Sequence, residues 1–200
     1  MILSRAVIAT PIADMLALDS GEGLCALEFI DPDKRLAGLD ARLRRWFPPH
    51  EIVDRETATI AQARAWLDAY FAGISADVSG LTLDMRGAAF ERRVWQELLR
   101  IPPGETTSYG AIAKTLGSPG ASRAVGAANG ANPIAIVVPC HRVVGASGSL
   151  TGYGGGLPRK TWLLGHEERW STRTGLSAKG KGHNEGLRAQ GTGQSELPFS

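Results

Sequence analysis

Short alternating runs of hydrophobic residues near the N-terminus predict β-strands joined by tight turns. The runs cover Ala6–Ala9, Met15–Leu18 and Leu24–Ile30, and turn-forming residues separate them at 10–11 and 20–23. A period of two residues is typical of strands that turn one face toward a core. We therefore expect three short strands at the start of the chain.

Helical spacing of hydrophobic residues follows over 36–47 and 60–71, with Ile52-Val53 as a further short strand between them. A proline pair ends the first helix and a glycine ends the second. Residues 1–85 therefore indicate a mixed α/β segment. Its aromatic stripe is expected to lie in the core, Cys25 is expected to be a small buried hydrophobe, and none of its side chains indicates chemistry.

The second half contains two short helices in the helix-turn-helix arrangement. Hydrophobic residues over 90–99 predict a helix stopped by prolines, and Ser108–Leu116 predicts the next, with Gly117 just past its end. Ser118 is expected to cap a further helix that runs to about Gly130, with a proline in its first turn. From this spacing alone, DNA binding and ordinary helix packing both stay open.

A run of β-branched residues, Ile134–Val138, predicts a buried strand that leads directly to Cys140. A loop with six glycines follows over Gly145–Gly156, and a last helix is expected from Pro158 to about Arg169. Residues 171–200 are rich in Gly, Ser, Thr, Lys and Gln and contain few bulky apolar side chains, which predicts a disordered tail.

Composition narrows the class of protein. The 200 residues are 43% hydrophobic and 21% charged, which excludes a largely disordered chain, a collagen-like repeat and a coiled coil. No apolar run approaches the roughly 20 residues of a membrane helix, and the first residues lack the pattern of a signal peptide. Two cysteines cannot form a disulfide framework, so we expect a cytoplasmic protein.

Charge is divided unevenly along the chain. Residues 1–85 hold eight basic and 13 acidic side chains, residues 86–170 hold ten and five, and residues 171–200 hold four and two. An acidic part joined to a basic part suggests that the basic part meets a polyanion, of which nucleic acid is the commonest.

Cys140 is a candidate nucleophile, because His141 follows it and a nearby imidazole favours the thiolate. Glu167 or Glu168 could supply the carboxylate that orients the histidine. Two other interpretations stay open: a buried cysteine that only packs, and neighbouring side chains on opposite faces of a strand that never meet. A zinc site is disfavoured because the other thiol, Cys25, lies in the first segment.

Taken in order, the motifs of the second half resemble the O6-alkylguanine-DNA alkyltransferase family. The matching segments are Gly104-Glu105, Ser108-Tyr109, Ser122–Gly126, Asn132-Pro133, the PCHRVV motif at 139–144, the loop Gly148–Gly156, Lys160–Leu164 and His166-Glu167. The resemblance is dense over about 86–169 and looser over 1–85, where 10–18 and 23–29 look like the opening hairpin of the family.

The resemblance implies an α/β (α+β) fold with two domains and a tail. Residues 1–85 would form a ribonuclease-H-like α/β domain without catalytic residues. Residues 86–170 would form a mostly helical domain with the helix-turn-helix and the active-site cysteine, and 171–200 would be the disordered tail.

The resemblance also implies a single-turnover methylated-DNA–protein-cysteine methyltransferase that needs no cofactor. Cys140 resembles the alkyl acceptor, His141 the base that takes the thiol proton through a water, and Glu167 the carboxylate that holds the histidine. Asn132 resembles the hinge between the recognition helix and the active-site strand. The implied partner is double-stranded DNA with O6-alkylguanine, or O4-methylthymine, met by a monomer without an obligate protein partner or membrane.

The same resemblance assigns residues to DNA. Tyr109 resembles the residue that crowds the target phosphate and bonds the extruded guanine, and Arg123 the finger that fills the space left in the stack. Base flipping is required because a protein thiol cannot reach the alkyl carbon in line inside a duplex. The other expected DNA contacts are Ser122, Ala124, Gly126 and Arg142.

The resemblance implies a base pocket lined by backbone groups of Cys140 and Val143, together with Tyr153 and Gly154 of the glycine-rich loop. Asn129 would face the flipped base with a polar side chain where some members place a bulky apolar one, which bears on the alkyl groups that fit. Some animal members bind zinc through N-terminal Cys and His residues. Cys25 and His50 alone do not reproduce that set, so no metal is expected.

Two rival functions make different demands on these residues. A lesion-binding relative without transfer activity would lack the acceptor cysteine, which this chain has at Cys140. A cysteine hydrolase built on Cys140, His141 and Glu167 would need direct contact between thiol and imidazole. It would have no use for Tyr109 or Arg123.

Overall fold

The computed structural model describes residues 1–30, 33–47 and 49–174. Four strands form one sheet: β1 (Ile2–Ile8), β2 (Met15–Asp19), β3 (Leu24–Phe29) and β4 (Glu51–Asp54). Their order across the sheet is β3-β2-β1-β4. The first three are antiparallel neighbours, and β4 lies parallel to β1. The predicted strands are confirmed. β1 begins at Ile2, before the predicted Ala6, because its first residues also pair with β4.

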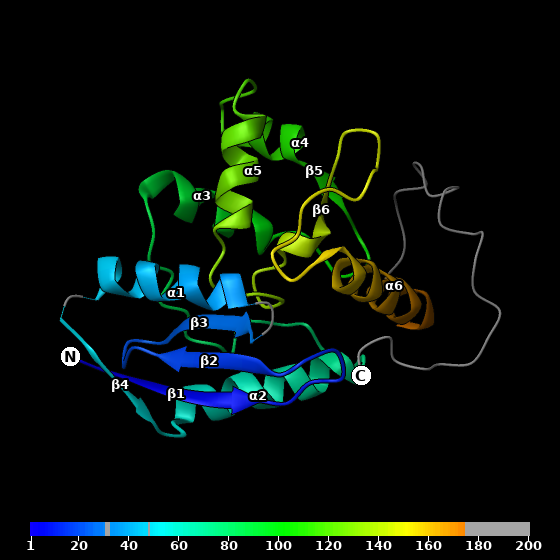
Figure 1. Ribbon diagram of the computed structural model, residues 1–200. Helices are drawn as coiled ribbons and strands as arrows, with labels where there is room; N and C mark the ends of the chain where they lie inside the picture. Colours follow the sequence, from blue (N-terminus) through cyan, green and yellow to red (C-terminus); the bar gives the residue numbers. More distant parts are fainter. Residues whose placement is uncertain (31–32, 48, 175–200) are drawn as a thin grey trace.

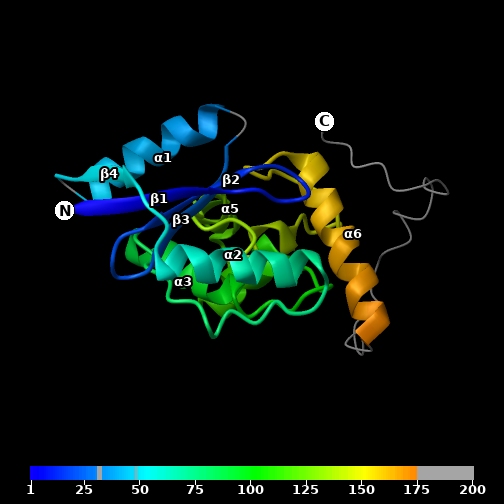
Figure 2. The same cartoon turned by 90° about the horizontal axis from the view of Figure 1, so that it is seen from below.

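Helices α1 (Asp33–Trp46) and α2 (Ala58–Phe71) cover opposite faces of this sheet (Figure 1 and Figure 2). Thr57 caps α2 by accepting a hydrogen bond from the Ile60 amide at 3.2 Å. Residues of odd and even position in β2 pack against different helices: Met15 lies in the core with α2, and Leu18 lies with α1. In the predicted aromatic stripe of α2, Trp66 and Tyr70 are buried in the core, and Phe71 is partly buried against it.

The edge strand β3 joins the sheet to the second half of the chain. The Leu27 amide donates to the Pro133 carbonyl and the Leu27 carbonyl accepts from the Ala135 amide, both at 2.8 Å. Leu24 makes a similar bridge to Leu83. Because these bonds use the open edge of the sheet, they fix the segment before Cys140 against a rigid element.

The predicted helix-turn-helix is present, with one boundary corrected. α3 (Ala89–Leu98) and β5 (Thr107–Ser108) precede α4 (Tyr109–Thr115), and Ser108 caps α4 through the Ala111 amide at 3.1 Å. α5 begins at Ser122 and ends at Gly130, so the predicted start at Ser118 is wrong. Residues 118–121 form a turn instead, closed by a 2.8 Å bond from the Ala121 amide to the Ser118 carbonyl.

The predicted strand over Ile134–Val138 is also wrong. These five residues are buried, but they form successive turns in which Ile136 adopts a φ of 68°. Hydrogen bonds within the segment, such as that from the Val138 amide to the Ile134 carbonyl at 3.0 Å, replace a ladder with a neighbouring strand. A 3₁₀ helix, Cys140–Arg142, follows and leads into β6 (Val143–Val144), which pairs parallel to β5.

The last helix, α6 (Leu157–Thr174), runs past its predicted end near Arg169. It continues because Trp170 and Ser171 are buried, and the Ser171 hydroxyl donates to the Pro103 carbonyl at 3.0 Å. The first residues of the predicted tail are therefore helical, and the rest of that tail lies outside the described residues. Within the described part of the chain, none of the helices combines the length and the apolar character needed to cross a membrane.

Candidate active site

Cys140 begins the 3₁₀ helix and is only 3% exposed. Its sulfur accepts a hydrogen bond from Asn132 Nδ2 at 3.1 Å, and its carbonyl accepts one from Asn129 Nδ2 at 3.3 Å. The tight helical turn removes the objection that neighbouring side chains of a strand point apart. Cys140 is therefore fixed at both its sulfur and its backbone.

Asn132 closes the turns that precede the cysteine. Its Oδ1 accepts from the Ile134 amide at 3.0 Å, and its Nδ2 donates to the Val138 carbonyl at 2.8 Å as well as to the Cys140 sulfur. One fully buried amide thus connects the residues after α5, the buried turns and the sulfur of Cys140. Asn132 is the predicted hinge before an active-site strand, and its contacts are with turns where that strand was expected.

His141 and Glu167 form a fully buried pair, with 2.8 Å between Nε2 and Oε1. Glu168, the other candidate carboxylate, is exposed. Burial alone would raise the pKa of Glu167, but the charges and hydrogen bonds of His141 and Arg142 outweigh it and hold this pKa below its ordinary value. Burial lowers the pKa of His141 despite the nearby carboxylate, so the imidazole is neutral at pH 7.

The identity of the partner fixes the tautomer of His141. An ionised carboxylate only accepts hydrogen bonds, so Nε2 carries the proton that it donates to Glu167. Nδ1 is therefore the basic nitrogen, and it is buried without a hydrogen-bond partner among the described residues. A histidine held in this way is equipped to take up a proton at Nδ1.

Arg142 corrects the prediction that it contacts DNA. Its side chain is buried and donates to both oxygens of Glu167, from Nε at 2.9 Å and from Nη2 at 2.8 Å. Nη1 donates to the Ile101 carbonyl. Because the planar guanidinium binds the carboxylate with two parallel bonds, Arg142 holds the site together from inside.

Two further donors to Glu167 were missed by sequence reasoning. The Tyr70 hydroxyl donates to Oε1 at 2.7 Å and the Gly104 amide donates to Oε2 at 3.2 Å. Gly104 has a φ of +78°, and a Cβ there would lie 2.2 Å from the Ser171 hydroxyl oxygen, so this approach requires glycine. The helical stripe over 60–71 predicts only that Tyr70 is a core residue, because the spacing of apolar positions does not indicate which group its hydroxyl bonds.

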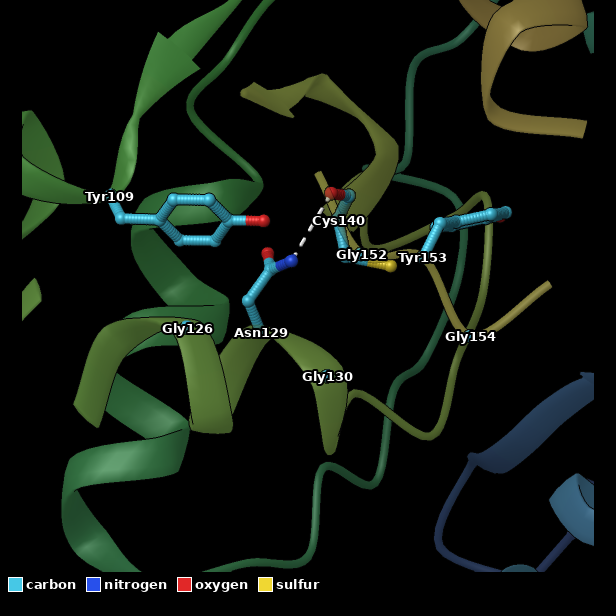
Figure 3. Close-up of a pocket in the computed structure, with 8 residues that line it drawn as sticks. All are labelled: Tyr109, Gly126, Asn129, Gly130, Cys140, Gly152, Tyr153 and Gly154. Carbon is cyan, nitrogen blue, oxygen red and sulfur yellow. Dashed lines mark hydrogen bonds between the residues drawn. The ribbon is translucent and has the colours of Figure 1, made fainter. Parts of the chain in front are cut away.

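A cavity of about 240 Å³ lies beside the cysteine. Figure 3 shows Tyr109 and Tyr153 on opposite sides of Cys140, with Asn129 between Tyr109 and the cysteine. The lining residues are Tyr109, Gly126, Asn129, Gly130, Cys140, Gly152, Tyr153 and Gly154. Of the predicted pocket residues, Asn129, Tyr153 and Gly154 line this cavity, whereas Val143 is buried and does not line it.

The glycine-rich loop is held by a buried lysine that sequence reasoning gave no separate role. Lys160 Nζ donates to the Val143 carbonyl at 2.6 Å and to the Thr151 carbonyl at 2.8 Å. Burial lowers its pKa, which the nearby Cys140 partly offsets. Within the loop, a Cβ at Gly155 would lie 2.7 Å from the rings of both Phe29 and Tyr153, so glycine permits this close packing.

Apart from Arg142, the predicted DNA-contact residues lie along the helix-turn-helix beside the cavity. Arg123 and Ala124 are exposed at the start of α5, and Ser122 is half-buried. Gly126 lies against the Tyr109 ring, which itself begins α4. The helix-turn-helix therefore presents a cation at its surface and an aromatic ring at the edge of the cavity.

The second thiol is chemically separate from this site. Cys25 is buried in β3, and burial, with the charges of Asp84 and Asp19, raises the pKa of its thiol to about 12. Among residues 1–30, 33–47 and 49–174, no three His, Cys, Asp or Glu side chains are grouped to hold a metal.

Comparisons with known proteins agree with these features. Residues 89–169 match the model of the 6-O-methylguanine DNA methyltransferase DNA binding domain. A methylated-DNA–protein-cysteine methyltransferase of Mycolicibacterium paratuberculosis is 52% identical over 154 residues, which span 77% of this chain and 92% of that relative.

Solved structures with this architecture include Mycobacterium tuberculosis OGT in complex with DNA. It has a TM-score of 0.69 and 42% identity, over 85% of this chain and 94% of that one. The O6-methylguanine-DNA methyltransferase of the archaeon Pyrococcus kodakaraensis has a TM-score of 0.65 and 25% identity, over 82% of this chain and 98% of that one.

Proposed function

This chain belongs to the O6-methylguanine DNA methyltransferase family, and on that premise we propose that Cys140 is the residue that accepts the alkyl group. The chain is a methylated-DNA–protein-cysteine methyltransferase, which repairs DNA by alkyl transfer. One observation carries the assignment to Cys140: its sulfur lies at a cavity beside the helix-turn-helix, next to a neutral histidine held by a buried carboxylate.

Transfer begins with the loss of the thiol proton. His141 Nδ1 takes it through a water molecule, and Glu167 stabilises the imidazolium that forms. Asn132 Nδ2 donates a hydrogen bond to the sulfur and so favours the thiolate. The bond from Nε2 to Glu167 keeps Nδ1 in the basic form for this step.

A single displacement follows at the alkyl carbon. The sulfur–carbon bond forms as the carbon–O6 bond breaks, and the electron pair of the broken bond stays on the guanine. The guanine then takes up a proton at N1 from water, and the imidazolium of His141 returns its proton to water, so that the net change moves the thiol proton to the base. Because the thioether does not break again, each molecule reacts once. No cofactor enters this chemistry.

Base flipping brings the alkyl carbon to the buried sulfur. Tyr109 would support the extruded nucleotide at the mouth of the cavity, and Arg123, exposed on α5, would fill the gap in the stack. Ser122, Ala124 and Gly126 would contact the DNA backbone along the same helix. Arg142 is left out of this set because its guanidinium is bound to Glu167.

The cavity is proposed to hold the flipped base between Tyr109 and Tyr153, with Asn129 and Gly154 as further walls. O4-methylthymine is a second substrate in this proposal, because it presents the same O-methyl group on a smaller ring. Competition between duplexes that carry one lesion or the other measures the preference.

Intact mass spectrometry tests the assignment. After incubation with a duplex that contains one O6-methylguanine, the protein should gain one methylene unit, and peptide mapping should find it on Cys140. The same duplex without the lesion is the control. Repeated turnover without a change in protein mass would instead indicate a hydrolase. A hydrolase needs direct contact between thiol and imidazole, whereas His141 Nε2 is bound to Glu167 and Nδ1 has no thiol partner among the described residues.

A further inference from the structure

Tyr70 connects the first segment of the chain to the proposed catalytic pair. It belongs to α2, which packs on the sheet, and its hydroxyl donates to Glu167 Oε1 at 2.7 Å. The ring is fully buried, stacked on Trp66 at 5.3 Å and held edge-on by Phe71 and Trp170. This packing holds the Tyr70 ring in one orientation, with its hydroxyl directed at Glu167.

The hydroxyl shares its acceptor with the histidine. Oε1 of Glu167 accepts from Tyr70, from His141 Nε2 and from Arg142 Nη2, all within 2.8 Å. A carboxylate oxygen has two lone pairs, so three donors compete for its charge. Each hydrogen bond that Oε1 accepts reduces the negative charge that this oxygen presents to the His141 imidazole.

We infer that Tyr70 is a positioning residue for alkyl transfer, which acts through Glu167 to keep His141 a neutral base. The inference rests on the proposed function, in which His141 takes the thiol proton. It also gives the first segment an indirect part in the reaction, since none of its described residues lines the cavity. Burial keeps the pKa of the Tyr70 hydroxyl well above its ordinary value, so it stays a neutral donor at working pH.

Removing the Tyr70 hydroxyl should change the pKa of His141 in a predictable direction. Without this donor, Oε1 attracts the imidazolium more strongly, and the pKa of His141 rises. Protonated His141 cannot accept the thiol proton, so the acidic limb of the rate profile moves to higher pH.

Other groups around His141 stay in place when only the hydroxyl is removed. Arg142 and Lys160 lower the pKa of His141 by their charge, and the Tyr153 ring lies 6.4 Å from the imidazole. His166 Nε2 donates to the Tyr70 backbone carbonyl at 2.9 Å and makes no bond to the hydroxyl. Cys140 precedes His141 directly.

The test is the pH dependence of transfer by Tyr70→Phe, from a duplex with one O6-methylguanine between pH 5 and 9. We expect the acidic limb to move up by about half a pH unit or more, with a rate near that of the wild type at the alkaline end. Phe71→Leu is the matched control, because Phe71 packs on the same ring and makes no bond to Glu167. It should lower stability without moving the limb.

A second measurement does not depend on transfer. Nitrogen-15 NMR of the His141 imidazole, assigned with His141→Gln, reports its pKa directly in the wild type and in Tyr70→Phe. Tyr70 replaced by 3-fluorotyrosine, a stronger donor that retains the ring, should move this pKa down. An unchanged His141 pKa in both variants, or an equal shift in Phe71→Leu, would overturn the inference. Loss of transfer to Cys140 in the wild type would overturn the proposed function alone.

Discussion

Asn132 Nδ2 donates a hydrogen bond to the sulfur of Cys140, with 3.1 Å between the two atoms. The same Nδ2 lies 2.8 Å from the Val138 carbonyl, and Oδ1 accepts from the Ile134 amide. All of these groups are buried, so none can exchange its partner for solvent. The geometry around the sulfur is therefore set before any substrate binds, which is the preorganisation that electrostatic catalysis needs.

Asn132→Ala should both destabilise the protein and slow transfer. It leaves the buried Ile134 amide without its side-chain acceptor, at a cost of about 1–3 kcal/mol, whereas the Val138 carbonyl keeps its bond from the Cys140 amide. Urea unfolding measures the first effect and single-turnover transfer the second. Asn132→Asp separates them, since it retains Oδ1 for Ile134 but places an acceptor beside the thiolate. A variant that keeps the wild-type rate in spite of this would show that the amide serves only the turn.

Cys140→Ala should abolish transfer and leave binding to lesion-bearing duplex nearly unchanged, because the cavity and the helix-turn-helix are untouched. Cys25 cannot replace it, since its thiol has a pKa of about 12 and lies buried in the sheet. Intact mass and gel-shift titration measure the two properties. Methyl transfer to Cys25 in this variant would contradict the assignment.

Glu167→Gln should cost about 3–5 kcal/mol in the free energy of unfolding at pH 7, because it leaves the buried Arg142 charge without its counterion. The folded state holds the pKa of Glu167 below its ordinary 4.5, so the wild type gains this stability above that pH and loses it as pH falls further. The difference between the two proteins should therefore narrow toward acid pH. Urea unfolding at several pH values measures it.

The exposed Glu168→Gln is the matched control for this change, one residue along the same helix. It should be within about 0.5 kcal/mol of the wild type at every pH. A constant difference between Glu167→Gln and the wild type from pH 7 to pH 3 would mean that packing, and not the charge of the carboxylate, is responsible.

Much of this arrangement could be predicted from the sequence. Period-two and helical spacing located the strands and helices of the first segment, and Ser108 with Gly117 marked the limits of α4. These features are local, since caps and strand periodicity act within a few residues. The order of motifs around Cys140 indicated the family, which the relatives confirm.

The failures have non-local causes. Ile134–Val138 has the composition of a strand, but side-chain bonds from Asn132 and the edge of β3 make turns the stable form. The excess of basic residues over 86–170 suggested a surface that binds DNA, and Arg142, Arg159 and Lys160 contribute to that excess. All three are buried and form hydrogen bonds inside the protein. A count of charges does not distinguish a solvated cation from one that holds a core together.

Binding to undamaged duplex should weaken steeply as salt rises, because the cations left at the surface bind phosphates by releasing counterions. Lys114, exposed on α4, and Arg123 belong to the helix-turn-helix. Lys114→Ala should lower the slope of log affinity against log salt by about one. Arg44→Ala, an exposed cation on α1 in the acidic segment, is the control and should leave the slope unchanged. Affinity that does not depend on salt would contradict the electrostatic interpretation.

Arg123→Ala should slow transfer from duplex DNA without affecting a substrate that needs no flipping. An extruded base costs a few kcal/mol to reach, and at about 1.4 kcal/mol per tenfold the loss of the finger should slow the reaction by one to three orders of magnitude. The free base O6-benzylguanine enters the cavity directly, so its reaction with Cys140 should keep nearly the wild-type rate. Single-turnover rates on both substrates give the comparison, with Lys114→Ala as the control that removes a cation but no finger. Equal losses on both substrates would mean that Arg123, although it is exposed on α5, supports the fold or the thiolate. The reaction at Cys140, with His141 and Glu167, would then depend on Arg123 even without base flipping, and the finger role would be wrong.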